Sequence, residues 1–232
     1  MSWTTRLDLE NRGSDSGISK KLEEALLLAA NKGSLLFCSA PDEGVTTDGM
    51  FHSFFPVGCK NLSPHLFKIG AATATSMASS STGDTAQLDF LLPGHEVTEK
   101  PFGSVSPQKS NPKSGSSIAT ALAAGFAALI LHCVRLVAIK SVADDEGMLI
   151  PESTSAKHGI TVTEESLKRV KTYDGMMDIF KSIPRGMNNN RYLEVDSTFD
   201  SLGKFLDNKT ESTEEKMLKL TALVGNFLSW IR

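Results

Sequence analysis

A serine stands where a polar segment of the chain meets a long apolar one, and this position suits a nucleophile. Residues 99–117 are rich in Ser, Pro, Gly and Lys, which predicts a surface loop, and from Ser117 the sequence changes to the apolar run 118–131. We therefore expect Ser117 at the N-terminus of a buried helix. There, free backbone N–H groups and the helix dipole favour a developing oxyanion. Gly115 would allow a sharp turn and close approach of a substrate.

The same residues have a purely structural interpretation. A Gly-Ser-Ser sequence before a helix is also typical of a loop that ends in a serine N-cap, and the pattern alone favours that interpretation. The apolar run 118–131 has about 14 residues, whereas a spanning helix needs roughly 20. The run therefore predicts a helix buried in protein and no membrane partner.

Cysteines, charge and the N-terminal residues restrict the remaining chemistry. Cys38, Cys59 and Cys133 cannot all pair and have no metal-ligand spacing. Cys38 and Cys133 lie in apolar runs, which predicts buried reduced thiols and neither metal nor cofactor. The net charge of −3, without a Lys/Arg cluster, disfavours nucleic acid as a partner. Residues 1–13 contain no apolar signal core, so we expect a cytoplasmic protein.

The segments before the serine predict an α/β fold. Residues 16–33 have the apolar spacing of an amphipathic helix, with Ser19 as its N-cap and Gly33 as its left-handed stop. Three apolar segments then predict strands buried on both faces of a parallel sheet, and residues 76–87 between two of them predict a loop. The three strand segments are 34–40, 67–74 and 88–94.

The composition changes after residue 145, which predicts a boundary between a domain at 1–145 and a helical region at 146–232. Residues 161–183 predict a helix capped by Thr163 with acidic residues in its first turn. Residues 187–191 predict a break, and 213–231 a final amphipathic helix. No residue pattern in this region points to chemistry.

Segments around the serine resemble the nucleophile region of the subtilisin-like (S8) serine peptidases. GSSIAT (115–120) followed by ALAAGFAALIL is similar to the family's Gly-Thr-Ser-Met-Ala-Thr and its Ala/Gly-rich helix. LDFLLPG (88–94) resembles the strand and Ala-Pro-Gly turn that precede it.

Further segments upstream resemble the same family in the same order. FFPVG (54–58) followed by FKIGAATA is similar to the Tyr-Pro-Ala segment and its following Val-Gly-Ala strand. SLLFCSAPDEG (34–44) resembles the strand that ends in Ala-Gly-Asn-x-Gly, and Met1-Ser2-Trp3 the Met-Ser-Leu segment beside the substrate cleft. The particular residues of the segments FCSAPDEG, GSSIATALAAG and LILHCVRL are most similar to those of fungal intracellular members. The resemblance covers roughly residues 1–140, with 161–183 as a candidate for the family's last helix.

The resemblance implies an α/β fold with a partial subtilisin-like parallel sheet flanked by helices, followed by a helical tail. It implies a serine-type endopeptidase that hydrolyses peptides or proteins through an acyl-enzyme on Ser117. Asp42 aligns with the Asn whose side chain helps to form the oxyanion hole, and Gly44 and Gly115 align with flanking glycines.

Two departures from the family pattern concern catalysis. The family's catalytic Asp and His precede the Met-Ser-Leu segment, so no residue of this chain aligns with them, and an upstream domain of the same gene could supply both. His52, His65 and His95 lack the His-Gly-Thr-His context, and we interpret them as loop or surface residues. Asp42 replaces an oxyanion donor whose loss costs roughly 2.7–4 kcal/mol, a magnitude from subtilisin itself. An ionised carboxylate would also repel the oxyanion by ~1–4 kcal/mol.

A competing interpretation is a non-catalytic pseudopeptidase, or a truncated product, that acts as a protein-interaction module. The two interpretations share one structural expectation. In the family fold the upstream part supplies strands of the same sheet, so the strands of this chain are expected to have an open edge when it is alone.

Overall fold

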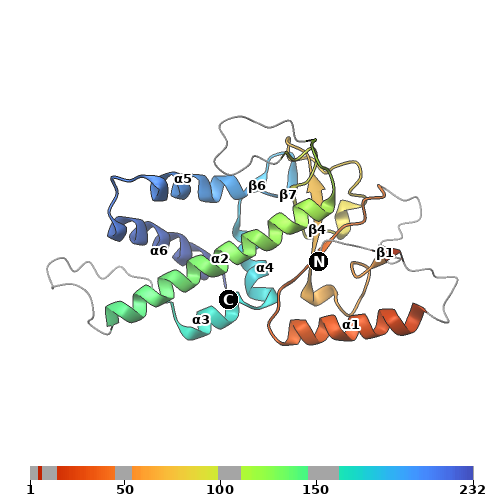
Figure 1. The fold of residues 1–232 in the computed structure, drawn as a ribbon, viewed down its shortest axis with the longest axis horizontal. Coiled ribbons are helices and arrows are strands. Elements are labelled where there is room, and N and C mark those ends of the chain that lie inside the picture. Colours follow the sequence, from red (N-terminus) through yellow and green to blue (C-terminus); the bar gives the residue numbers. More distant parts are fainter. Residues whose placement is uncertain (1–4, 7–14, 45–53, 99–110, 146–161, 232) are drawn as a thin grey trace. The chain divides into compact units, whose positions relative to one another are not determined.

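The computed structural model describes residues 5–6, 15–44, 54–98, 111–145 and 162–231 (Figure 1). The chain divides into two compact units, Met1–Gly125 with Arg185–Leu193 and Phe126–Pro184 with Glu194–Arg232. Met1-Ser2-Trp3, His52, most of the predicted loop 99–117 and the start of the predicted helix 161–183 lie outside the described residues.

The first unit is built on a five-stranded sheet in the order β2-β4-β5-β7-β6. The three apolar segments form its parallel strands β2 (Leu36–Ser39), β4 (Leu66–Ala72) and β5 (Phe90–Pro93), as predicted. The strand β7 (Asn189–Leu193) continues the sheet parallel to β5, and β6 (Arg185–Gly186) pairs antiparallel with β7. A separate two-stranded ladder joins β1 (Thr5–Arg6) to β3 (Phe54–Phe55). The α/β class is therefore confirmed.

Successive side chains of a strand point to opposite faces of the sheet, and in the central strands both faces are buried. On one face Cys38, Leu66 and Leu91 belong to a core cluster against which the leucines of α1 (Asp15–Asn31) pack. On the other face the rings of Phe37 and Phe67 stack with their centroids 4.7 Å apart. Strands that are buried on both faces need continuous apolar sequences, and this burial explains why the sequences of β2, β4 and β5 are continuously apolar.

The helix α1 confirms one predicted boundary and corrects the other. Its chain leaves through Gly33 in the left-handed conformation, with φ +83°, as expected for a glycine stop. The helix begins at Asp15, so the predicted N-cap Ser19 lies inside it. The apolar periodicity begins at Ile18, and periodicity alone cannot detect the polar turn that precedes it.

The long helix α2 (Ser116–Asp145) begins in the first unit and ends in the second. One face of its C-terminal half is buried, but Leu129, Leu136 and Ile139 on another face are 43%, 38% and 67% exposed. The prediction of a helix buried all round is therefore only half right. Among the described helices, α2 is the one whose length and apolar composition would suffice to cross a membrane.

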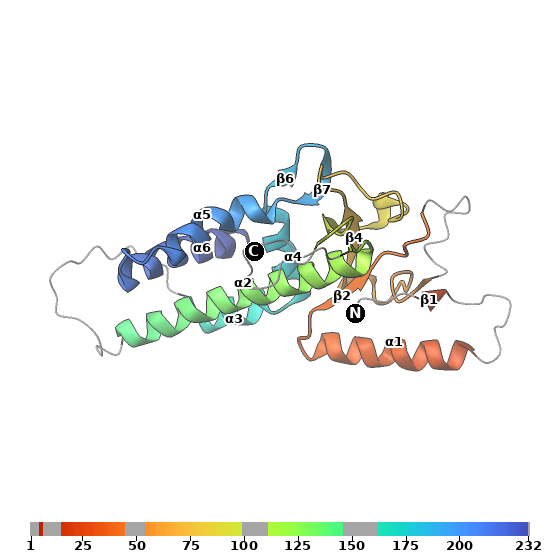
Figure 2. The same cartoon turned by 45° about the horizontal axis from the view of Figure 1, so that its top comes forward.

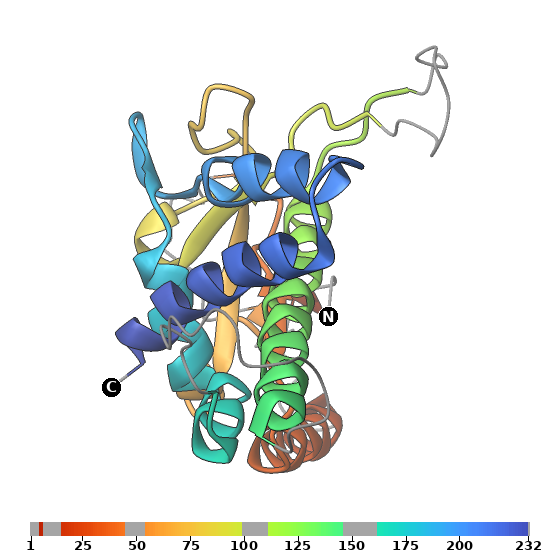
Figure 3. The same cartoon turned by 90° about the vertical axis from the view of Figure 1, so that its left-hand side faces the viewer.

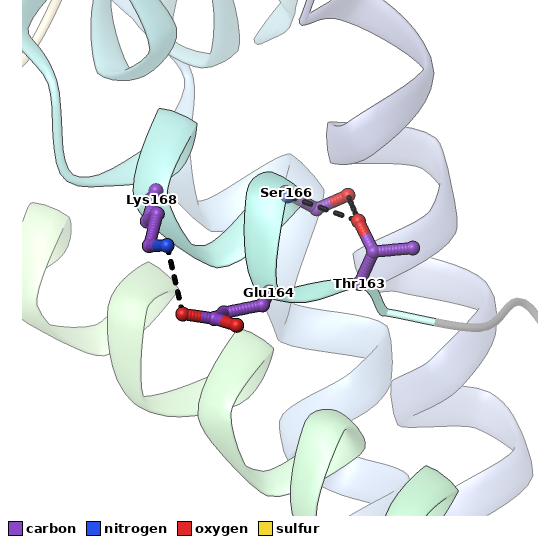
Figure 4. Close-up of polar contacts among 4 residues, drawn as sticks. All are labelled: Thr163, Glu164, Ser166 and Lys168. Carbon is purple, nitrogen blue, oxygen red and sulfur yellow. Dashed lines mark hydrogen bonds and ion pairs between the residues drawn. The ribbon is translucent and has the colours of Figure 1, made fainter.

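The predicted helix 161–183 is two helices in the structure, α3 (Glu164–Val170) and α4 (Tyr173–Ser182). Thr163 caps α3 as predicted, accepting a hydrogen bond from Ser166 N at 3.1 Å, and Glu164 pairs with Lys168 at 2.8 Å (Figure 4). A second cap, Thr172, starts α4. A Cβ on Gly175 would lie 2.1 Å from the carbonyl oxygen of Arg169, so only glycine permits this tight turn.

The second unit ends in α5 (Val195–Asp207) and α6 (Thr213–Trp230), which lie side by side (Figures 2 and 3). Ser212 and Glu215 form a capping box at the start of α6, the predicted final helix. Aromatic contacts join Phe199 to Phe126 and Phe227 within this unit.

The tail is not wholly helical. Residues 187–191 break the helices, as predicted, but they also belong to the hairpin of β6 and β7 that extends the sheet of the first unit. The hairpin escaped prediction because its residues are mostly polar and only partly buried, without the apolar alternation that marks a strand.

Substituting Gly70 tests the packing of the central strand. A Cβ there would lie 2.5 Å from side-chain carbons of Leu88 and Thr82, so Gly70→Ala is expected to destabilise the fold by about 1–3 kcal/mol. Gly125→Ala is the matched control, because nothing lies within 4 Å of its Cβ position on α2. It is expected to stabilise by up to about 1 kcal/mol. Urea unfolding measures both, and equal effects of the two substitutions would contradict the packing.

Candidate functional site

Ser117 is the second residue of α2 and is partly exposed, as the sequence predicted. The preceding Ser116 is fully buried, and its carbonyl oxygen accepts a hydrogen bond from Thr120 Oγ1 at 2.8 Å. Gly115 enters the helix with φ +150°, a conformation that other residues rarely adopt. The Ser117 side chain therefore sits on the first turn of a well-anchored helix, while its role as nucleophile stays a prediction.

Buried hydroxyl groups hold the start of α2 against the central strand. The backbone N–H of Ala71 in β4 lies 3.1 Å from Thr82 Oγ1 and 3.2 Å from Ser116 Oγ, and it donates to both. Thr82 Oγ1 in turn donates to the carbonyl oxygen of Ala71 at 2.9 Å. Because these groups are buried, losing one partner would leave a polar group unsatisfied. Thr82 lies in a segment interpreted only as a loop, and no sequence signal identified it.

The exit of β5 approaches the same point. Gly115 N donates to the carbonyl oxygen of Gly94 at 2.7 Å. A Cβ on Gly94 would lie 2.8 Å from Ala71 Cβ and 2.9 Å from the carbonyl oxygen of Gly115, so glycine permits the close approach of three segments. Ser117 thus lies beside the carboxyl ends of β4 and β5, the edge where open parallel sheets hold their ligands.

The structure brings Asp42 to the start of α2, as its alignment with the oxyanion-hole position implies. Asp42 follows β2, and both of its carboxylate oxygens accept a hydrogen bond from Ser116 N, at 3.0 and 2.9 Å. The side chain itself is exposed. In this arrangement the carboxylate is an acceptor at a helix N-terminus, which favours negative charge. Its role in an oxyanion hole stays a prediction.

The two described histidines before Ser117 lie at opposite ends of the parallel strands. His65 precedes β4 and so lies at the amino ends of the strands, away from Ser117. His95 follows β5 on the edge of Ser117; its backbone N–H donates to the carbonyl oxygen of Ala72 at 3.2 Å, and its side chain is exposed. The interpretation of His95 as a surface residue agrees with this exposure.

The cysteines are free thiols, and the two predicted to be buried, Cys38 and Cys133, are buried. Burial raises the pKa of the Cys38 thiol to about 12 and that of Cys59 to about 11, so neither forms a thiolate readily near neutral pH. Within the described ranges, no three His, Cys, Asp or Glu side chains are grouped to hold a metal ion.

Two arginines of the β6–β7 hairpin fasten it to the sheet, and the sequence reasoning missed both. The guanidinium of Arg191 donates to the carbonyl oxygens of Leu88 and Ala86. The guanidinium of Arg185 lies 5.0 Å from the centre of the Phe90 ring. Burial and the neighbouring Arg191 lower the pKa of Arg185. These contacts hold β7 beside β5, the strand that ends next to Gly94.

The chain was compared with known families and structures. The model of the subtilase family, peptidase S8, matches residues 1–136. No curated protein matches the chain at a significant level. Among solved structures, the chain is similar to a lanthipeptide protease, with 21% identity and a TM-score of 0.43 over 56% of this chain and 45% of that one.

Two further structures are similar at the same level. The self-cleaved protease domain of PatA matches with 19% identity and a TM-score of 0.43, over 79% of this chain and 55% of that one. The prenylagaramide maturation protease PagA matches with 19% identity and a TM-score of 0.41, over 75% and 52%. This chain therefore spans about half the length of the structures it matches.

Removing the two anchoring hydroxyls separately should have unequal effects. Thr82→Val removes a group that both accepts from and donates to Ala71, and we expect a loss of about 1–3 kcal/mol in the free energy of unfolding. Ser116→Ala leaves Ala71 N bonded to Thr82, so a loss of about 0.5–1.5 kcal/mol is expected. Urea titrations of both variants decide the order, and a larger loss for Ser116→Ala would contradict this account of the anchor.

Proposed function

The chain belongs to the subtilase family, and from this premise we propose that Ser117 is the nucleophile of a serine-type endopeptidase acting on peptides or proteins. The observation that carries the proposal is the position of Ser117, partly exposed on the first turn of α2 and beside the carboxyl ends of parallel strands. In the proposed reaction Ser117 Oγ attacks the peptide carbonyl, the amine leaves with a proton, and water then hydrolyses the acyl-enzyme.

A base must take the Ser117 proton and return it to the leaving amine. We propose that an upstream domain of the same gene supplies this histidine and its aspartate. Two features support a missing neighbour. The strand β2, with Phe37 and Cys38 buried, lies at an edge of the described sheet, and α2 exposes Leu129 and Ile139. An exposed strand edge in a folded domain is normally covered or blunted, because it can pair with another chain.

The alternative function is a non-catalytic pseudopeptidase that binds a protein partner. The exposed apolar side chains of α2 favour it, because contiguous exposed apolar patches mark interaction surfaces. Three free cysteines support the proposed cytoplasmic location, since thiols stay reduced there. The proposed kinship with fungal intracellular subtilases rests on the wording of the segments around Asp42 and Ser117.

Labelling with a fluorophosphonate probe tests the nucleophile. Because a serine hydroxyl without a base is a poor nucleophile, the purified 232-residue chain should be labelled slowly, over hours, and Ser117→Ala should abolish the label. Rapid stoichiometric labelling that is lost in Ser117→Ala would contradict the need for an upstream base. Labelling that persists in Ser117→Ala would contradict the role of Ser117.

Restoring the upstream part tests the partial domain. A protein that contains the preceding gene segment should be labelled at Ser117 much faster than the 232-residue chain and should unfold in one cooperative transition. The shorter chain alone should be poorly soluble or melt broadly, because the open edge of β2 favours aggregation. A sharp transition above about 50 °C from the short chain alone, a temperature typical of complete domains, would contradict this proposal.

A further inference from the structure

We propose that Asp42 closes the candidate site in the free chain. Its negatively charged carboxylate is held by Ser116 N–H at the N-terminus of α2, and this charge must move away before an oxyanion can form beside Ser117. This inference rests on the proposed role of Ser117 and adds a self-blocking contact to it.

The geometry of the contact places the negative charge at the helix start. The two carboxylate oxygens of Asp42 lie 2.9 and 3.0 Å from the same backbone nitrogen, that of Ser116, the residue before Ser117. A Cβ built on Gly115 would lie 3.2 Å from Asp42 Oδ2, so the carboxylate lies against the glycine that enters α2. A helix N-terminus holds one anion most favourably at this point, through free N–H groups and its dipole.

The backbone on both sides of Asp42 is anchored, so the contact is built into the fold. Ala40 N donates to the carbonyl oxygen of Ile69 at 2.8 Å, which ties the end of β2 to β4. Gly44 N donates to the carbonyl oxygen of Ser81 at 2.9 Å, and Gly44 has φ +75°. The Asp42 side chain is nevertheless exposed on its outer side, so a rotation toward solvent would release Ser116 N–H.

The ionised carboxylate acts against the reaction in two ways. It carries the same charge as the oxyanion of a tetrahedral intermediate, which raises the energy of that intermediate. It also has no proton to donate, whereas the family's Asn offers an N–H₂ group. An Asn at position 42 would remove the charge, keep an oxygen that can accept from Ser116 N–H, and add a donor. Asp42→Asn is therefore the substitution that separates capping from blocking.

The test compares fluorophosphonate labelling of the full 232-residue chain with its Asp42→Asn, Asp42→Ala and Glu43→Gln variants, with Ser117→Ala as the negative control. We expect Asp42→Asn to be labelled at least tenfold faster than the unmodified chain. Asp42→Ala should be labelled at an intermediate rate, because it loses the charge without gaining a donor. Glu43→Gln removes one charge from the next residue of the same loop and should change the rate less than twofold.

Amide hydrogen exchange of Ser116, followed by NMR, reports on the contact independently of Ser117. Ser116 N–H should exchange several-fold faster in Asp42→Ala and at nearly the original rate in Asp42→Asn and Glu43→Gln. Unchanged exchange in Asp42→Ala would overturn the contact itself.

The labelling outcomes separate the two proposals. Equal labelling of the unmodified chain and Asp42→Asn, lost in Ser117→Ala, would leave Ser117 as the nucleophile and overturn the blocking role of Asp42. Absence of label in every variant, Asp42→Asn included, would overturn the blocking role of Asp42, while the protein that contains the preceding gene segment tests the proposed function separately.

Discussion

The two backbone groups of Ala71 join the segments that make up the candidate site. Its N–H donates to the hydroxyls of Thr82 and Ser116, and its carbonyl accepts from Thr82 Oγ1 and from Ser79 N. Thr82, Ser116 and Ser79 are all buried, so water cannot readily replace a lost partner. The start of α2 is therefore fixed to β4 by groups that would be costly to separate. Ser117, the next residue of α2, inherits its position from this anchor.

The sheet bears on both the position of that anchor and the proposal of a partial domain. β4 pairs with β5 as far as Ala72 but with β2 only as far as Ile69, so at Ala71 the side beyond the end of β2 is occupied by Thr82, Ser79 and Ser116. β2 has a described neighbour on one side only, yet Phe37 and Cys38 are buried. This imbalance, more than any single residue, is what favours a partial domain over a self-sufficient one.

The parts that sequence analysis predicted are those in which burial leaves a direct signal. The strands containing Phe37, Ile69 and Leu91 are buried on both faces, and such strands need continuous apolar runs. Gly33 ends a helix and Thr163 caps one through local interactions that depend on the residue type, so both could be predicted from the sequence. In the candidate site, Ser117 and Asp42 were found through the family resemblance. Thr82 and the β6–β7 hairpin were missed, because their partners are distant in sequence and their own residues are polar.

Asp42 shows why a local rule and a catalytic requirement diverge at this site. A carboxylate at a helix N-terminus is a favourable cap, contributing about 1 kcal/mol, and Asp is among the best residues for it. Catalysis requires the same region of positive potential to be open until the oxyanion forms, because only interactions that strengthen in the transition state accelerate the reaction. A carboxylate held at Ser116 N–H uses that potential in the ground state. Under the proposed role of Ser117, the residue at position 42 therefore sets a balance between the stability of α2 and the reactivity of that serine.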